Sequence, residues 1–213
     1  MSSHPINSLE RINAVQLLPI VAPIVASGTG AKIANVLPNP EHALGTVVTC
    51  YILWGMAVPL ALMVLVIYYQ RLALHKLPAR EAIVSCFLPL GPMGYGGFTI
   101  MLLGTVSKTL FPEVGFLHPD AGTVAYIFGF FIALILWSFG LMWLAFALAT
   151  IWKSRPFPFN MGWWGFTFPI GVFSASTIQL GKEMPSLVFR VLGTVGCDPR
   201  RVRVCTLTPS ADF

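Results

Sequence analysis

Hydroxyl groups, rather than charges, are the polar side chains that this sequence places deep inside apolar stretches. Five long stretches contain no Asp, Glu, Lys or Arg, and all four histidines lie outside them. Ionisable groups at membrane depth normally mark proton relays or charge-paired sites, and none is visible in these stretches. Hydroxyls and backbone dipoles can still bind an ion by hydrogen bonding. The hydroxyls in question belong to Thr29, Thr99, Ser174, Ser176 and Thr177.

Catalytic and cofactor chemistry finds little support in the residue pattern. The apolar stretches contain no nucleophile beside a base and no carboxylate pair, so an enzyme is disfavoured. The four cysteines lack metal or redox spacing, so we expect no metal and no cofactor. The segment "GTGAK" at 28–32 lacks the spacing of a phosphate-binding loop, which argues against ATP-driven pumping. We also expect no nucleic-acid partner.

The composition predicts an integral membrane protein with the lipid bilayer as its surroundings. Hydrophobic residues make up 56% of the chain and charged residues 10%, which leaves too little polar surface for a soluble domain. A spanning helix needs about 20 apolar residues, and the apolar runs are too long and too continuous for barrel strands. We predict an all-α polytopic protein with about five transmembrane helices and a truncated sixth. The spans lie near 14–36, 44–70, 82–107, 121–152 and 161–181, with the stub at 187–196.

Basic loops set the expected orientation. The loop 71–80 and the loop with Lys153 and Arg155 are basic and lie on one side, whereas the loops around Glu41 and at 108–120 are mixed or acidic. Because Lys and Arg near span ends stay on the cytoplasmic side, we expect residues 1–11 to form a short cytoplasmic N-terminus. The net charge of +5 fits this bias and fits anion conduction equally well.

Two kinds of span alternate along the chain. The first, third and fifth contain Pro, Gly, Ser and Thr, whereas the second and fourth consist mainly of large apolar residues. Broken backbone at membrane depth is tolerated where protein or water satisfies it, so we predict repeated helical hairpins with kinked inner helices around a pore. Close packing of small residues is the alternative. The kink or pore-lining candidates are Pro19, Pro23, Gly28, Pro89, Gly91, Pro92, Gly94, Gly96, Gly97, Gly165, Thr167, Pro169 and Gly171.

Three segments carry a family resemblance: "LPLGPMGYGGFTIMLLG" (88–104), "GWWGFTFPIGVFSASTIQL" (162–180) and "SLVFRVLGT" (186–194). They resemble the tellurite-resistance and dicarboxylate transporter family, which includes plant slow anion channels, fungal malate permeases and fungal sulfite efflux pumps. The amino-acid sequences of the first two segments are most similar to those of the sulfite pumps. The resemblance implies ten helices in five hairpins around a pore, with residues 12–196 as a partial transporter domain matching the fifth to tenth helices. Residues 197–213 form an atypical tail.

The resemblance implies transport of a small anion across the plasma membrane, with sulfite ahead of malate or another C4-dicarboxylate. The alternative is a non-conducting relic or a regulatory subunit that assembles with full-length relatives, and self-association is also open. Backbone dipoles at kinks, the hydroxyls and basic pore mouths would attract the anion. Lys32 is a candidate for a mouth, although snorkelling to the interface explains it as well, and Arg190 is a weaker candidate.

The resemblance also implies a gate. A phenylalanine of the ninth family helix blocks the pore midway, and the residue before the proline in "FTFP" matches it, which is Phe168. Hydrophobic constrictions that exclude water are a known gating device. The alternative is that Phe166, Phe168 and Phe173 all serve as packing aromatics.

Overall fold

The structure is a computed structural model that describes residues 14–74, 85–153, 164–184 and 189. These residues form helices and connections, with no strand among them, so the all-α prediction is confirmed. The N-terminal segment 1–11, the tail 197–213 and, apart from Phe189, the stub 187–196 lie outside the described residues.

The helices overlap the predicted spans, although α3 ends at Val114, beyond the predicted end at 107. In chain order they are the 3-10 helix η2 (Ala14–Leu17), α1 (Leu18–Ala34), α2 (Pro40–Leu74), α3 (Leu90–Val114), α4 (Ala121–Lys153) and α5 (Trp164–Glu183). Four segments of the described chain are long and apolar enough to cross a membrane, and they correspond to the first four predicted spans: Ala14–Ala34, Pro40–Leu74, Ser85–Val114 and Ala121–Lys153. The fifth, α5, is not among them, because its Ser, Thr, Gln and Gly residues lower its hydropathy.

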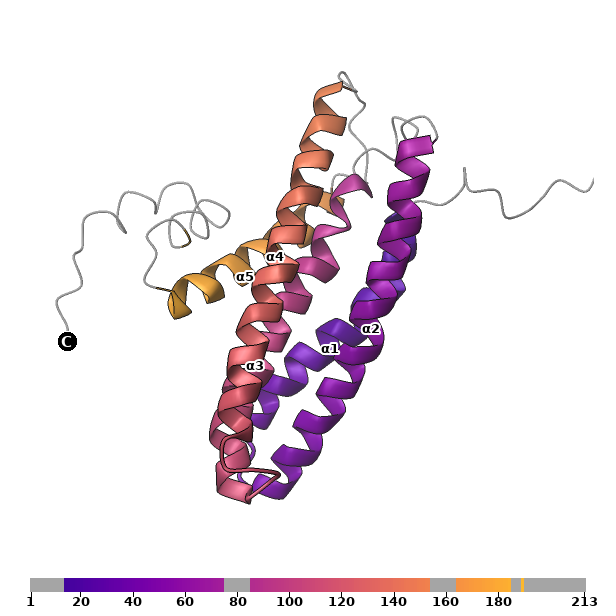
Figure 1. Cartoon of the computed structure of the whole chain (residues 1–213). Helices are drawn as coiled ribbons and strands as arrows, with labels where there is room; N and C mark the ends of the chain where they lie inside the picture. The colour runs from indigo at the N-terminus through magenta and orange to yellow at the C-terminus, as the bar shows by residue number, and fades with distance from the viewer. Residues whose placement is uncertain (1–13, 75–84, 154–163, 185–188, 190–213) are drawn as a thin grey trace, which may run out of the picture.

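Two helical hairpins form the body of the molecule. α1 packs against α2 and α3 packs against α4, and the connections 35–39 and 115–120 lie at the end opposite the C-termini of α2 and α4 (Figure 1). Asn39 caps α2 by accepting a 2.9 Å hydrogen bond from the Glu41 N–H, with Pro40 at the first helical position. Gly115 ends α3 with a left-handed φ of 67°, a conformation that glycine adopts without strain.

α3 is the central helix. It contacts α1, α2, α4 and α5, and 78% of its apolar window is buried, against 28% in α2 and 33% in α4. The Gly-rich third span is thus the most buried of the four candidate spans, and the predicted outer helices α2 and α4 are the least buried. That the inner helices face a pore stays a prediction. α1 is 39% buried.

Glycines bring α3 close to its neighbours. A Cβ on Gly104 would lie 3.0 Å from the Ala125 carbonyl oxygen of α4, and a Cβ on Gly129 would lie 2.8 Å from the Ile100 carbonyl oxygen of α3. The predicted pore-lining residues Gly94, Gly96 and Gly97 face helix contacts as well, with α5, α2 and α4 respectively. At these positions the structure has the close packing that small residues permit, and a pore-lining role for them stays a prediction.

The prolines fall into two groups. Pro19 lies in the first turn of α1, and Pro89 and Pro92 lie at the N-cap and in the first turn of α3. There a missing N–H costs no intrahelical hydrogen bond. Pro23 and Pro169 lie inside α1 and α5, which run through them as continuous helices. The outer helix α2 also contains an internal proline, Pro59, so proline alone does not distinguish inner from outer spans.

Candidate functional site

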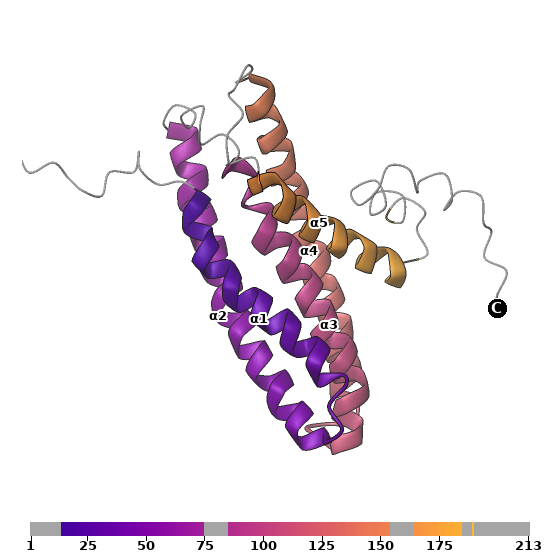
Figure 2. The same ribbon diagram turned by 180° about the vertical axis from the view of Figure 1, so that it is seen from behind.

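The site is built from the three predicted inner helices α1, α3 and α5. α5 crosses α3 and α4 obliquely (Figure 2). It approaches α3 so closely at Gly94 that a Cβ there would lie 2.7 Å from the Cα of Phe173. This contact fixes which face of α5 is covered and which is open.

Phe168 lies on the open side of α5. Its side chain is 43% exposed. A Cβ on Gly91 of α3 would lie 3.5 Å from the Phe168 ring and 3.9 Å from Val21 of α1. The candidate gate is therefore placed where the first turn of α3 meets both α1 and α5.

The other two phenylalanines of α5 are packing groups. Phe173 is 8% exposed and stacks on Trp137 of α4, with ring centroids 5.9 Å apart and an interplanar angle of 5°. Phe166 is half-buried and meets the ring of Phe87 edge-on at 4.7 Å. The packing alternative thus fits Phe166 and Phe173, and the gate role of Phe168 stays a prediction.

Some of the candidate residues near Phe168 on α5 are exposed and others are not. Thr167 and Gly171 are exposed, and nothing lies within 4 Å of a Cβ built on Gly171. Residues i and i+4 share one face of a helix, so these two positions mark an open stripe beside Phe168. Pro169 is buried and Gly165 is half-buried, so they lie away from this stripe or at its edge.

The candidate hydroxyls differ in their hydrogen bonding. Thr29 is exposed and donates to the Val25 carbonyl of its own helix at 3.0 Å. Thr177 accepts a hydrogen bond from Trp137 Nε1 at 2.8 Å and donates to the Phe173 carbonyl. Ser174 is buried. Thr99 and Ser176 are fully buried, and neither hydroxyl has a hydrogen-bond partner within the part of the chain that the structure describes.

The ammonium group of Lys32 on α1 contacts α3. Its Nζ is 5.3 Å from the centroid of the Phe98 ring, and that ring lies 5.6 Å from the ring of Tyr95. Tyr95 and Phe98 were not singled out from the sequence, because an aromatic residue in an apolar span carries no mark of which helix it faces. Arg190 lies outside the described residues.

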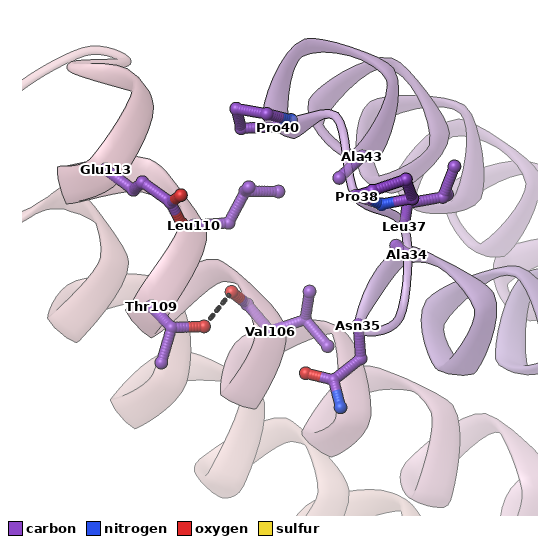
Figure 3. Close-up of a pocket in the computed structure, with 10 residues that line it drawn as sticks. All are labelled: Ala34, Asn35, Leu37, Pro38, Pro40, Ala43, Val106, Thr109, Leu110 and Glu113. Atoms are coloured by element: carbon purple, nitrogen blue, oxygen red, sulfur yellow. Dashed lines mark hydrogen bonds between the residues drawn. The ribbon is translucent and has the colours of Figure 1, made fainter.

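A separate pocket lies between the α1–α2 connection and the C-terminal part of α3 (Figure 3). Its volume is about 100 Å³, and Asn35, Thr109 and Glu113 are its polar lining residues. The Thr109 hydroxyl donates to the Val106 carbonyl at 3.0 Å, and the carboxylate of Glu113 would repel an anion. None of the candidate site residues lines this pocket.

Metal binding has no visible basis in the described ranges. Within residues 14–74, 85–153, 164–184 and 189, no three His, Cys, Asp or Glu side chains lie together as metal ligands would.

Comparisons with known proteins find sequence relatives of this chain. Residues 1–197 match the model of a family described as voltage-dependent anion channel. The chain is 56% identical over 194 residues to a sulfite efflux pump of Arthroderma otae, covering 91% of this chain and 51% of that protein. It is 55% identical to the sulfite efflux pump of Trichophyton rubrum, with the same coverage.

A more distant relative is also named a sulfite efflux pump. The sulfite efflux pump of Candida albicans is 31% identical over 205 residues, which cover 87% of this chain and 42% of that protein. The chain thus spans about half the length of the curated relatives it matches. No solved structure matches it significantly.

Proposed function

The chain belongs to the voltage-dependent anion channel family, and on that premise we propose that it takes part in the export of sulfite across the plasma membrane. It is an integral membrane protein of a transport family, not an enzyme. Support for sulfite comes from the two relatives at 55 and 56% identity, both of which are named sulfite efflux pumps. Export from a cell requires the plasma membrane, which is our reason for placing the protein there.

The position of Phe168 is the observation that supports a pore function best. Its ring lies at the junction of α1, α3 and α5, and 43% of it is exposed, as is common for apolar side chains in these helices, so its place at the junction is what supports the proposal. A phenyl ring at a narrow point excludes water and ions because it occupies volume and is poorly hydrated. Phe168 therefore acts as a hydrophobic gate in this proposal, with Thr167 and Gly171 lining the adjoining wall.

Attraction of the anion requires groups other than buried charges. The apolar stretches of the sequence contain no Asp, Glu, Lys, Arg or His, so an anion that enters must exchange part of its hydration for hydroxyl and backbone dipoles. Lys32 lies just beyond the first of these stretches, and its ammonium adds positive charge next to the ring of Phe98 on α3. Such a path binds an anion weakly enough to release it, which conduction requires.

Sulfite export can be tested in fungal cells that lack their own sulfite exporter. We expect cells that express the chain to release sulfite faster than cells with an empty vector, at matched intracellular sulfite. Malate release, measured in the same cells, tests the dicarboxylate alternative. Sulfite release equal to the vector control, with the protein present at the cell surface, would contradict the proposal.

A further inference from the structure

An apolar groove lies between α2 and α4. Both helices pack on α3, whereas they do not pack closely on each other. Two hollows occupy the space between them, with volumes of about 410 and 220 Å³. Because both hollows are lined by Phe139 and Met142, they form one continuous space, the α2–α4 groove. None of the candidate pore residues lines it.

The α2–α4 groove has a buried floor and exposed rims. Leu65 and Trp143 of its lining are each 1% exposed, whereas Val66 and Ile135 are each 65% exposed. Both helices are long and apolar enough to cross a membrane, so in the bilayer the rims face hydrocarbon. The groove is therefore filled by a lipid and not by water.

The length of the groove favours a short lipid. It extends from Leu62 to Tyr69 on α2, which is about 10 Å at 1.5 Å per residue. An acyl chain that crosses one leaflet spans about 15 Å, half of the hydrocarbon core. Aromatic rings lie at the Tyr69 end, where Tyr69 approaches Trp143 at 6.5 Å and Phe146 at 5.9 Å between centroids. A compact ring system fits this space better than an extended chain does.

Tyr69 provides a hydroxyl at the same end. Of the other polar lining residues, Ser138 donates to the Ile135 carbonyl at 2.9 Å, and the indole nitrogen of Trp143 is buried, whereas Tyr69 is 50% exposed. Tyr69 lies close to the end of α2 at Leu74, beside the basic loop, where a tyrosine reaches the membrane–water interface. A sterol in a bilayer has its single hydroxyl at this depth.

The sequence of α2 fits the same ligand. Leu65, Tyr69 and Arg71 follow the order of a short pattern proposed for cholesterol contact, in which a Leu or Val precedes a Tyr and then a Lys or Arg. The pattern is common and carries little weight by itself. Here two of its members, Leu65 and Tyr69, line the groove.

We propose that the α2–α4 groove binds one sterol molecule, with the fused rings between α2 and α4 and the sterol hydroxyl hydrogen-bonded to Tyr69. The flat ring system lies against the aromatic side chains of Phe139 and Trp143, which line the groove from α4. This site is separate from the path of the anion, and it does not depend on which anion is transported.

Binding can be measured on the purified chain in detergent with dehydroergosterol, a fluorescent sterol that accepts energy from tryptophan. Trp143 lies in the groove, so we expect energy transfer that saturates as dehydroergosterol is added and that cholesterol reverses. Cholestene, which has the same rings without the hydroxyl, should compete about three- to tenfold less well, because it lacks one hydrogen bond.

Two substitutions test the two parts of the site. Tyr69→Phe keeps the ring and should weaken dehydroergosterol binding about three- to tenfold, and cholesterol and cholestene should then compete equally. Tyr51→Phe is its control, because it removes another tyrosine hydroxyl of α2, one that lies 3.3 Å from the Ser107 hydroxyl. Ser138→Phe places a ring in the groove and should weaken binding about tenfold or more. Val124→Phe places a ring on α4 at a position that is 61% exposed and outside the groove. Both controls should bind as the parent does.

Three outcomes would overturn the proposal. The first is energy transfer that rises without saturation, which indicates sterol dissolved in the detergent alone. The second is equal competition by cholesterol and cholestene in the parent, which indicates a groove for any hydrocarbon, acyl chains included. The third is parental affinity in Tyr69→Phe or in a folded Ser138→Phe. If Ser138→Phe does not give monodisperse protein, Tyr69→Phe and the cholestene competition still decide between the outcomes.

Discussion

The indole of Trp137 on α4 donates a 2.8 Å hydrogen bond to the hydroxyl of Thr177 on α5, and the same indole ring stacks on Phe173 one turn earlier. At the far end of α5, Tyr126 of α4 donates a hydrogen bond to Glu183. α5 packs more extensively on α3 than on α4, so these directional contacts add to that packing. The helix that carries the candidate gate is thus held by α3 and tied to α4 by hydrogen bonds.

Replacing Thr177 by Val should loosen this attachment. The valine removes the acceptor and leaves Trp137 Nε1 buried without it, and interhelical hydrogen bonds of this kind contribute about 0.6 to 1.7 kcal/mol in membrane proteins. We expect a lower unfolding midpoint in detergent, measured by tryptophan fluorescence. Thr150→Val, which removes a hydroxyl bonded only to its own helix, should change the midpoint less. Equal effects of the two substitutions would contradict the anchoring role of Thr177.

Gly94→Ala should damage the contact between α3 and α5. Its Cβ would lie 2.7 Å from the Cα of Phe173, and since backbone atoms cannot move aside as a side chain can, the two helices must separate. Overpacking of this kind costs about 1 to 3 kcal/mol. Gly55→Ala is the control, because nothing lies within 4 Å of a Cβ at that position. We expect less monodisperse protein for Gly94→Ala in size-exclusion chromatography and an unchanged yield for Gly55→Ala.

The sequence predicts the positions of the spans well, because length and charge decide them. The predicted spans near 44–70 and 121–152 correspond to α2 and α4, and α3, which comes from a Gly-rich span, is the most buried of the four candidate spans. Length, hydropathy and glycine content are averages over whole segments, so one atypical residue changes the prediction little.

The roles of individual glycines and prolines could not be predicted in the same way. Gly94 packs on α5, Gly91 lies beneath Phe168, and Gly171 faces open space, although all three read alike in sequence. The role of a glycine depends on which helix faces it, which is a tertiary property. The Thr99 hydroxyl differs from those of Thr105 and Thr150 for the same reason, because only the fold shows that it is buried without a hydrogen-bond partner in the described part of the chain.

Topology can be tested with single cysteines placed at the two ends of the bundle. Cysteine at Leu117, which is 74% exposed in the α3–α4 connection, should react with a membrane-impermeant maleimide added outside intact cells. Cysteine at Leu77, in the basic loop after α2, should react only after permeabilisation, because basic loops stay in the cytoplasm. Both are introduced after the four native cysteines have been replaced. Labelling of Leu77→Cys in intact cells would reverse the proposed orientation.

The gate assignment predicts that Phe168→Ala raises anion flux per molecule. Removing the ring opens the narrow point and lets water enter. Because Phe168 is 43% exposed and lies over Gly91, its truncation should cost little folded protein. The measurement is sulfite efflux in fungal cells, divided by the amount of protein at the cell surface.

Phe173→Ala and Phe166→Ala provide the matched controls on the same helix. Phe173 stacks on Trp137 and Phe166 packs on Phe87, so each truncation removes a packed ring, which typically costs about 3 to 5 kcal/mol. These variants should lower the amount of surface protein without raising flux per molecule. The two roles therefore predict opposite changes in flux per molecule: loss of a gating ring raises it, and loss of a packing ring does not. Flux per molecule at or below the parent for Phe168→Ala would make it a packing residue, and a gain for Phe166→Ala instead would place the gate two residues earlier.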